Sequence, residues 1–383
     1  MRQWKTRVAD VFRKGDMVLL ALSVVSSLFG IVMIVTASAY TGNTRYLTVQ
    51  TGALIAGVLL YLVMTAIDID ILAGWRTVLF LFNAGLIALL LVFGVQGNTG
   101  NLSWLEFPFL PFNIQPAEVC KIGYIIILAK TMSIHRNHVS SLRCVGQLGF
   151  HMLFMVAEII LISRDTGVAL IFIFIFLVMC YVGGVNFWWF LGGAGAFALA
   201  APTLWQYVIR EDQKRRILAL YDPTIDPTGL NELWQTNRQL QALRNGGLSG
   251  QGLFNGTMTQ NGSVPAQHTD AIFCAIGEQL GMIGCLAVLV LLLLVVARVV
   301  YVGIKSPDYM NRMICMGIAA MFLFQILINV GMCIGVLPVI GLALPFFSYG
   351  GSSLLTTYLA LGIVSGIKMR PSRETTSRYI RPW

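Results

Sequence analysis

Ten apolar stretches, most of them close to twenty residues long, constrain most strongly how this chain can fold. The hydrocarbon core of a bilayer is about 30 Å thick, and about 20 helical residues cross it. The composition agrees: 57% of the residues are hydrophobic and 11% are charged, against roughly a quarter charged in soluble domains. We therefore predict an all-α integral membrane protein with about ten transmembrane helices, residues 1–383 forming a single polytopic membrane domain. The predicted spans are residues 17–36, 46–67, 77–95, 114–132, 146–163, 167–182, 187–205, 279–302, 313–333 and 349–369.

The first apolar stretch follows a basic start (Arg2, Lys5, Arg7) and ends at Ala37-Ser38-Ala39, which looks like a signal-peptidase site. The apolar region of a signal peptide is about 7–15 residues long, and this stretch is longer. We expect an uncleaved first helix.

Lys and Arg in the short loops predict the orientation. One side carries nearly all of them, whereas the short loops of the other side hold only Arg45 and Arg164. Basic loops stay in the cytoplasm, so we expect both termini there, which requires an even number of helices. The net charge of +9 then reflects orientation and does not indicate a nucleic-acid partner. The seven scattered cysteines lack CxxC spacing and are expected to be small apolar fillers.

The polar segment 206–270 is the exception to this charge rule, as long loops are, and we place it outside, between helices 7 and 8. Its clusters of Gly, Asn, Pro and Asp predict repeated turns rather than a helix. Apolar residues within it favour an ordered loop that docks on the membrane domain. These expected anchors are Tyr221, Leu230, Leu233, Trp234, Leu248, Leu253 and Phe254.

Charged residues at membrane depth are costly unless they are paired or solvated. Glu118 and Lys121 are three residues apart in one predicted helix, so they share a face and can pair. A structural ion pair and a substrate-binding role are equally good interpretations. Glu158 in the fifth span is better explained by helix packing than by catalysis, and Glu278 is expected to contact a polar group on a neighbouring helix.

The strongest local group is His268-Thr269-Asp270, where the outer loop re-enters the membrane. Partial desolvation would raise the pKa of Asp270 and suit it to general-base work. An Asp that caps the next helix is an equally good explanation.

A basic run, Lys214-Arg215-Arg216, lies in the same loop. Arg side chains suit phosphate or pyrophosphate, although a solvated basic face is the simpler explanation. The glycines after residue 245 do not complete a nucleotide-binding GxGxxG. The sequence also lacks HExxH and GxSxG, which leaves zinc and serine-hydrolase chemistry without support. We predict no metal ligands, although a divalent cation remains compatible with pyrophosphate chemistry.

Several motifs in this order resemble the SEDS family, the FtsW, RodA and SpoVE type of proteins that polymerise peptidoglycan glycan strands. They are Gln115-Pro116-Ala117-Glu118 with Lys121, Arg216-Ile217, Asp222-Pro223, Gly246-Gly247-Leu248, His268-Thr269-Asp270, Asn329-Val330-Gly331, Leu344-Pro345-Phe346 and Ser348-Tyr349-Gly350-Gly351. The resemblance covers nearly the whole chain. Differences are Ala117 in place of the usual Ser, Ser103 in place of an Arg before Trp104, and Ser163-Arg164-Asp165 in place of Glu-Pro-Asp.

The resemblance implies that Asp270 is the catalytic residue and that Glu118 and Lys121 are functionally important. From their position and charge, and not from the resemblance, Arg215 and Arg216 are predicted to stabilise a pyrophosphate leaving group, with Lys121 as a second contact. His268 and Trp104 complete the predicted substrate-binding residues. The implied reaction is an inverting glycosyl transfer from lipid-linked disaccharide-peptide (lipid II) to a growing glycan chain, with a lipid pyrophosphate as leaving group.

The resemblance also implies a class B penicillin-binding transpeptidase as partner, membrane lipids around the chain, and the bacterial cytoplasmic membrane as location. It leaves elongation, division and sporulation open. Two alternatives remain from other classes: a flippase or transporter of the lipid-linked precursor, and a non-catalytic scaffold of the wall-synthesis complex.

Overall fold

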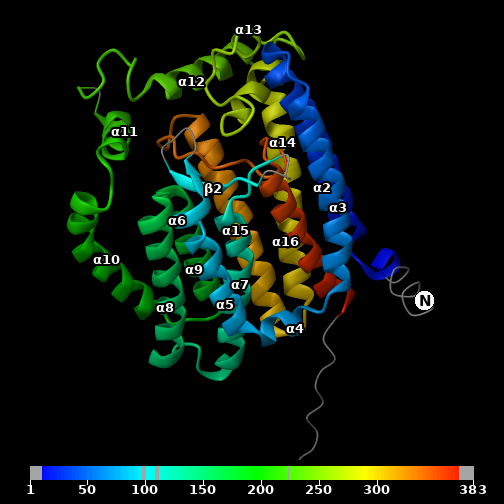
Figure 1. Cartoon of the computed structure of the whole chain (residues 1–383), viewed down its shortest axis with the longest axis vertical. Coiled ribbons are helices and arrows are strands. Elements are labelled where there is room, and N and C mark those ends of the chain that lie inside the picture. Colours follow the sequence, from blue (N-terminus) through cyan, green and yellow to red (C-terminus); the bar gives the residue numbers. More distant parts are fainter. Residues whose placement is uncertain (1–10, 97–100, 108–111, 223, 371–383) are drawn as a thin grey trace, which may run out of the picture.

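Helices occupy each of the ten stretches that we predict to cross the membrane (Figure 1). The computed structural model describes residues 11–96, 101–107, 112–222 and 224–370. The ten helical stretches are α2 (Met17–Ser38), α3 (Arg45–Ala66), α5 (Arg76–Ala88) with α6 (Leu90–Phe93), α7 (Pro116–Ile134), α8 (Leu142–Glu158) with the π-helical turn η3 (Ile159–Ser163), α9 (Thr166–Val182), α10 (Phe187–Tyr207), α14 (Ile272–Lys305), α15 (Tyr309–Cys333) and α16 (Gly351–Met369).

Short elements complete the bundle. They are η1 (Ala39–Thr41), α4 (Ile69–Gly74), η2 (Arg136–His138) and an antiparallel pair of strands, β1 (Gly94–Gln96) and β2 (Leu102–Leu105). Within the described ranges, eight helices are long and apolar enough to cross a membrane. The other two predicted spans are α9, which has 17 residues, and α7, which carries three charged side chains, Glu118, Lys121 and Lys130.

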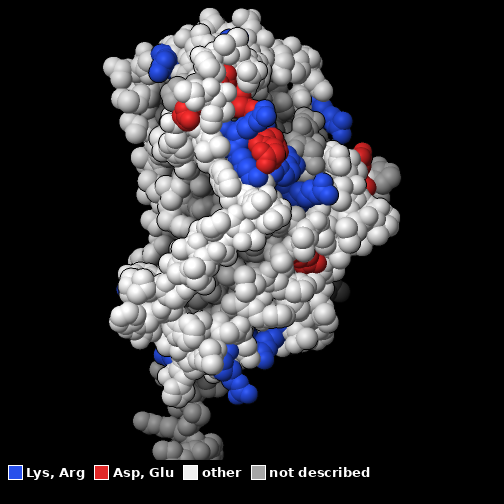
Figure 2. Space-filling model, turned by 90° about the vertical axis from the view of Figure 1, so that its left-hand side faces the viewer, with Lys and Arg blue, Asp and Glu red and all other residues white. Residues whose placement is uncertain are grey.

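Charged side chains on the surface are concentrated toward the two ends of the molecule. On the face that carries α10 and α11, Lys and Arg side chains gather in the upper half, and a second group lies at the lower edge (Figure 2). The band between the two groups is almost free of charged side chains. Such a band is what a lipid-facing surface requires, because exposed charge at membrane depth is costly.

Small residues allow the helices of the bundle to pack closely, as is common in membranes. A Cβ added at Gly57 of α3 would lie 2.8 Å from the ring of Tyr358 in α16, and one added at Gly317 of α15 would lie 2.6 Å from Ile125 in α7. Helix α10 differs from the others, because none of its residues is buried. It stands at the edge of the molecule, away from the main bundle (Figure 1).

One end of the bundle is tied together by a buried carboxylate. Asp16, just before α2, is 0% exposed. Its oxygens lie 2.8 Å and 3.1 Å from the guanidinium of Arg298 in α14, and 3.4 Å from the Nζ of Lys368 in α16. The start of α2 and the end of α16 therefore lie at the same end of the molecule, as the predicted even number of spans requires.

The prediction that residues 206–270 form turns rather than a helix is wrong for two parts of this segment. Helices α11 (Glu211–Tyr221) and α12 (Trp234–Gly246) lie within it, with the short α13 (Thr257–Gln260) after them. The turn-forming residues are concentrated between these helices, around Asp226 and Gly250. The stretches that became helical are rich in Arg, Gln, Leu and Ala, which favour helix.

Residues 206–270, here called the outer segment, do dock on the bundle, but not by burying the side chains of the predicted anchors. Tyr221, Leu230 and Leu248 are 72%, 68% and 68% exposed. Helix α12 instead packs on α14, and its buried residues are Thr236, Gln239, Ala242 and Gly246. The sequence pattern predicted that apolar side chains would anchor the segment, whereas small and polar residues of α12 make the contact with α14.

The glycine-rich part of the outer segment forms backbone hydrogen bonds on both sides of a break in α14. The backbone of Gly281 has φ 67° and ψ −165°, so the helix is interrupted there. The amides of Met282 and Ile283 donate to the carbonyls of Gly247 and Leu248 at 2.9 and 3.3 Å. In return, Gln251 donates to the carbonyl of Glu278 at 3.0 Å. The loop thus supplies partners for backbone groups that the broken helix leaves free.

Replacing Gly246 by Ala is expected to destabilise this joint. A Cβ at this position would overlap the carbonyl oxygen of Gly277 in α14, so α12 would have to move away. Overpacking of this kind costs about 1–3 kcal/mol. The measurement is the midpoint of thermal unfolding in detergent. Gly146→Ala in α8 is the control, because its Cβ would meet nothing within 4 Å; equal midpoints for both variants would contradict the close contact.

Candidate active site

Two segments that are distant in the sequence from the His268-Thr269-Asp270 motif hold its backbone: α15 and the stretch just before α16. The Nδ2 of Asn329 in α15 donates to the carbonyl of Asp270 at 2.8 Å. The hydroxyl of Ser348 donates to the carbonyl of Thr269 at 2.7 Å, and the amide of Tyr349 donates to the carbonyl of His268 at 2.8 Å. The motif residues noted in the sequence therefore meet in space, and they fix the position of Asp270.

Asp270 does not cap the helix that follows it. The N-cap residue of α14 is Ala271, and the Asp270 carboxylate makes no hydrogen bond or ion pair with the described residues. A Cβ added at Gly341, whose φ is 80°, would lie 3.3 Å from the Asp270 Oδ2. Burial raises the pKa of Asp270 to about 6, and the negative charge of Asp165 acts in the same direction. A carboxyl group with such a pKa can accept a proton near neutral pH.

Asp165 is a site residue that we did not single out from the sequence. Its Oδ1 accepts a hydrogen bond from the amide of Val168 at 3.1 Å, which caps α9, and its Oδ2 accepts one from the Ser103 hydroxyl at 3.3 Å. Burial raises the pKa of Asp165, and the Val168 and Ser103 bonds oppose that rise. The signal in the sequence was its place in Ser163-Arg164-Asp165, where the aspartate stands as in the Glu-Pro-Asp of the family that the motifs resemble.

Glu118 and Lys121 form the ion pair that their spacing predicts. The Nζ of Lys121 lies 2.8 Å from the Glu118 Oε1, and the Lys121 side chain is 0% exposed. The pair lies at the start of α7, close enough to Asp165 that both charges act on the pKa of that carboxyl group. The contact shows pairing, and the substrate-binding role stays a prediction.

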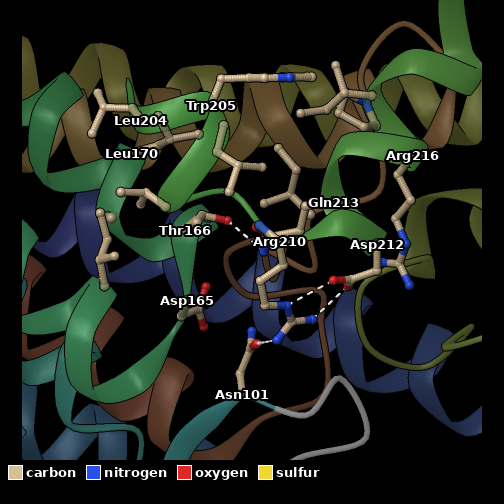
Figure 3. A pocket seen from close by; sticks show the side chains of 18 of the residues that line it. Asn101, Asp165, Thr166, Leu170, Leu204, Trp205, Arg210, Asp212, Gln213 and Arg216 are labelled. Carbon is tan, nitrogen blue, oxygen red and sulfur yellow. Dashed lines mark hydrogen bonds and ion pairs between the residues drawn. The ribbon is translucent and has the colours of Figure 1, made fainter. Parts of the chain in front are cut away.

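A cavity of about 350 Å³ lies between α9, α10 and α11 (Figure 3). Apolar side chains such as Leu170, Leu204 and Trp205 form one part of its wall, and residues 338–340 form another. Asp165 and Arg216 also line it. Residue 340 precedes Gly341, where an added Cβ would lie 3.3 Å from the Asp270 Oδ2, so the Asp270 carboxylate lies near this wall, although Asp270 itself does not line the cavity. The cavity combines an apolar body with a charged end.

The charged end of the cavity is ordered by hydrogen bonds that connect α11 to its neighbours (Figure 3). The Nε and Nη2 of Arg210 donate to the Asp212 carboxylate at 2.9 and 2.6 Å, and its Nη1 donates to Asn101 at 3.2 Å. The Nε2 of Gln213 donates to the Thr166 hydroxyl at 3.0 Å. Sequence reasoning missed Arg210 and Asp212, because no motif surrounds them.

The two arginines predicted to bind pyrophosphate are separated by the structure. Arg216 lines the cavity. Arg215, its neighbour on α11, points elsewhere: its side chain is 68% exposed and lies 4.0 Å from Glu232. Successive residues of a helix project about 100° apart, so a single cavity receives one of them. Arg216 is the better placed of the two.

His268 and Trp104 lie apart from the cavity wall. The ring of His268 packs against Tyr46 and Tyr349, with centroids 4.8 and 6.0 Å away, and burial lowers its pKa. Trp104 follows Ser103 in β2, and side chains alternate along a strand. Because Ser103 faces Asp165, Trp104 faces the opposite way. The substrate-binding roles predicted for both residues stay predictions.

Glu278 and Glu158, the two other glutamates predicted at or near membrane depth, differ in their contacts. Glu278 contacts a neighbouring element as expected: its oxygens accept hydrogen bonds from the amides of Met258 and Thr259, both at 2.8 Å, at the start of α13. The Oε2 of Glu158 is buried and has no partner among the described residues. Within the same residues, no group of three or more His, Cys, Asp or Glu is placed to hold a metal ion.

Comparisons with known proteins identify the family of this chain. The model of the FtsW/RodA/SpoVE family, described as "Cell cycle protein", matches residues 16–373. "Probable peptidoglycan glycosyltransferase FtsW" of Trichlorobacter lovleyi is 31% identical over 369 residues, 93% of this chain and 94% of its own. "Peptidoglycan glycosyltransferase MrdB" of Escherichia coli K12 is 29% identical over 354 residues, 92% of this chain and 91% of its own.

A solved structure shares the fold. It is described as "Structural coordination of polymerization and crosslinking by a peptidoglycan synthase complex" and matches with a TM-score of 0.78 at 29% identity, over 92% of this chain and 97% of the other. The predicted all-α integral membrane fold is thereby confirmed, and so is the family that the motifs indicated. This chain belongs to the FtsW/RodA/SpoVE family.

Proposed function

We propose that this chain is a peptidoglycan glycosyltransferase that polymerises lipid-linked disaccharide-peptide into glycan strands at the outer face of the bacterial cytoplasmic membrane. The observation that carries the proposal is the position of Asp270, whose carboxylate lies near the wall of a cavity with an apolar body and a charged end that includes the Arg216 side chain. A lipid-linked pyrophosphate needs both features. The names of the relatives support the same activity.

The reaction that fits this geometry is an inverting displacement. The 4-hydroxyl oxygen of one disaccharide attacks the anomeric carbon of the other substrate, and the bond from that carbon to the pyrophosphate oxygen breaks. Asp270 accepts the hydroxyl proton, and the lipid pyrophosphate leaves with the electron pair. A pKa of about 6 keeps Asp270 mostly unprotonated at neutral pH without making it a very weak base.

Arg216 is the candidate for stabilising the leaving group. Negative charge builds up on the pyrophosphate as the bond breaks, and fixed donors stabilise such charge most when they are already in place. Arg216 lines the cavity near the Arg210–Asp212 pair. Its guanidinium can contact two oxygens at once.

Orientation and partner follow from the same proposal. The charged end of the cavity and Asp270 belong on the outer side, and both termini in the cytoplasm. A single-span class B penicillin-binding transpeptidase is the expected partner, which is consistent with a structural relative described as coordinating polymerisation and crosslinking.

The direct test is glycan polymerisation from purified lipid II by the detergent-solubilised protein, with and without its cognate transpeptidase. Long glycan product supports the proposal. If no product forms under either condition, the transporter and scaffold alternatives become the better explanations. Flipping of the precursor in proteoliposomes would identify a transporter. Rescue of a depletion strain by an inactive variant would identify a scaffold.

The rate is expected to depend on pH through Asp270. Because only the unprotonated carboxylate accepts a proton, kcat/KM should rise as the pH increases through about 6 and level off above it. Asp165→Asn removes a negative charge that raises this pKa, so the rise should move to lower pH, while Asn still caps α9. A pH–rate series on both proteins measures the shift.

Glu106→Gln is the control for this series, because it removes an exposed carboxylate of the outer side. Its profile should match that of the unmodified protein. Identical profiles for all three proteins would show that Asp165 does not act on the catalytic group.

A further inference from the structure

A second, smaller pocket adjoins the cavity on its outer side. Its volume is about 140 Å³, and it lies between α11, the start of α12 and the segment after α15. The two hollows share Arg216, Pro338 and Val339 as wall residues. They therefore meet at Arg216, with an apolar body on one side of that guanidinium and a polar pocket on the other.

The side chains of this pocket are of the kinds that bind sugars. Asn231, Gln235 and Thr236 offer amide and hydroxyl groups for hydroxyl and acetamido partners, and Trp234 offers an aromatic face. Glu232 adds a carboxylate, which lies 4.0 Å from Arg215. The side-chain amides of Asn231 and Gln235 make no hydrogen bond with the described part of the chain. They are available to a ligand.

A buried aspartate holds the pocket in shape. Asp226 is 3% exposed, and its Oδ2 accepts hydrogen bonds from the amides of Asn231 and Leu233 at 3.1 and 3.0 Å. Both amides belong to the connection that enters α12. The polar residues of the pocket thus sit on a backbone that is ordered before any ligand binds, which reduces the entropy lost on binding.

The order of groups in the substrate matches the order of the two hollows. In a lipid-linked disaccharide the lipid is joined to pyrophosphate, and the pyrophosphate is joined to a sugar. With lipid in the apolar cavity and pyrophosphate at Arg216, the next group along the chain reaches the polar pocket. The pocket has room for roughly ten water-sized groups, which suits one pyranose ring, so the second sugar and the peptide stem would extend outside it.

We propose that the pocket formed by Asn231, Glu232, Trp234 and Gln235 binds the sugar ring attached to the pyrophosphate. This inference rests on the proposed function for the identity of the ligand. It makes α12 a substrate-binding element, and it gives the outer segment a role in distinguishing a sugar-bearing lipid from the bare lipid pyrophosphate that is released.

The test compares binding of two ligands, lipid II and undecaprenyl pyrophosphate, to the purified protein in detergent. In the double variant N231A/Q235A, lipid II is expected to bind roughly tenfold more weakly, as the loss of two hydrogen bonds predicts. Affinity for undecaprenyl pyrophosphate should stay within about twofold, because it has no sugar. The matched control is Q241A/N245A, which removes the same residue types from exposed positions of α12 outside the pocket.

Each outcome is decisive. Selective loss of lipid II affinity in N231A/Q235A alone supports the sugar subsite. Equal loss for both ligands, unchanged affinity for both, the same loss in the control, or an unmodified protein that binds neither ligand would overturn it. A protein that shows the selective loss but polymerises nothing would refute the proposed function while leaving the subsite in place.

Discussion

Asp270→Asn is expected to lower the rate of glycan polymerisation by about a hundred- to ten-thousand-fold, the range that general-base catalysis contributes. Asn has nearly the same size and cannot accept the proton. The bond that fixes this residue in place runs from Asn329 to its backbone carbonyl, so the substitution leaves it intact. The initial rate of product formation from lipid II, at matched protein concentration, measures the effect.

Two controls separate loss of the base from loss of the fold. The thermal midpoint of Asp270→Asn should equal or exceed that of the unmodified protein, because a partly buried charge has been removed. Glu211→Gln removes another acid of the outer segment, one that is 80% exposed, and should polymerise normally. An Asp270→Asn variant with normal polymerisation would end the assignment of this residue as the base.

Lys121→Met is expected to have the largest effect on stability. It leaves the Glu118 carboxylate without the ammonium group 2.8 Å away, in a site where Lys121 is 0% exposed. Removing one partner of a buried pair costs about 3–5 kcal/mol, because the remaining charge is uncompensated. The yield of folded protein and the midpoint of thermal unfolding should both fall.

The double variant E118Q/K121M tests the cause. It removes both charges, so it should recover most of the lost stability, since a buried pair is often replaceable without net cost. Lys130→Met, at the less buried end of the same helix, is the control and should change the midpoint little. If the double variant is as unstable as Lys121→Met, packing by the lysine stem is the cause rather than the charge. A stable double variant that no longer polymerises would support a role of the pair in substrate binding.

The membrane helices could be predicted well because the bilayer restricts the choices. Backbone groups in lipid must bond within their own segment, so long apolar stretches such as 313–333 become helices. The outer segment lacks this restriction. Its turn-forming residues were recognised around Asp226 and Gly250. The helix before Asp226, α11, and the helix between Asp226 and Gly250, α12, were not recognised, because they also depend on contacts with α9 and α14 that lie far away in the sequence.

The site was predictable where a motif carried it. Asp270 and the Glu118–Lys121 pair stood in recognisable surroundings, and the structure places both near Asp165. Arg215 and Arg216 could not be told apart in the sequence, because the direction of each side chain depends on how α11 docks. Asp165 and Arg210 were missed for the same reason, since their partners Ser103 and Asn101 are about sixty or more residues away in the chain.

The break at Gly281 divides α14 into two mechanically separate rods. The longer rod is fastened by Arg298 to Asp16 at the far end of the molecule. The shorter rod begins two residues after Asp270 and is fastened to the outer segment through the backbone of Gln251 and Gly252. The long rod is fastened to the same outer segment at its first residues, because the amides of Met282 and Ile283 donate to the carbonyls of Gly247 and Leu248. A displacement of the outer segment therefore acts on both rods at once, and through the shorter rod on the position of Asp270, the proposed base.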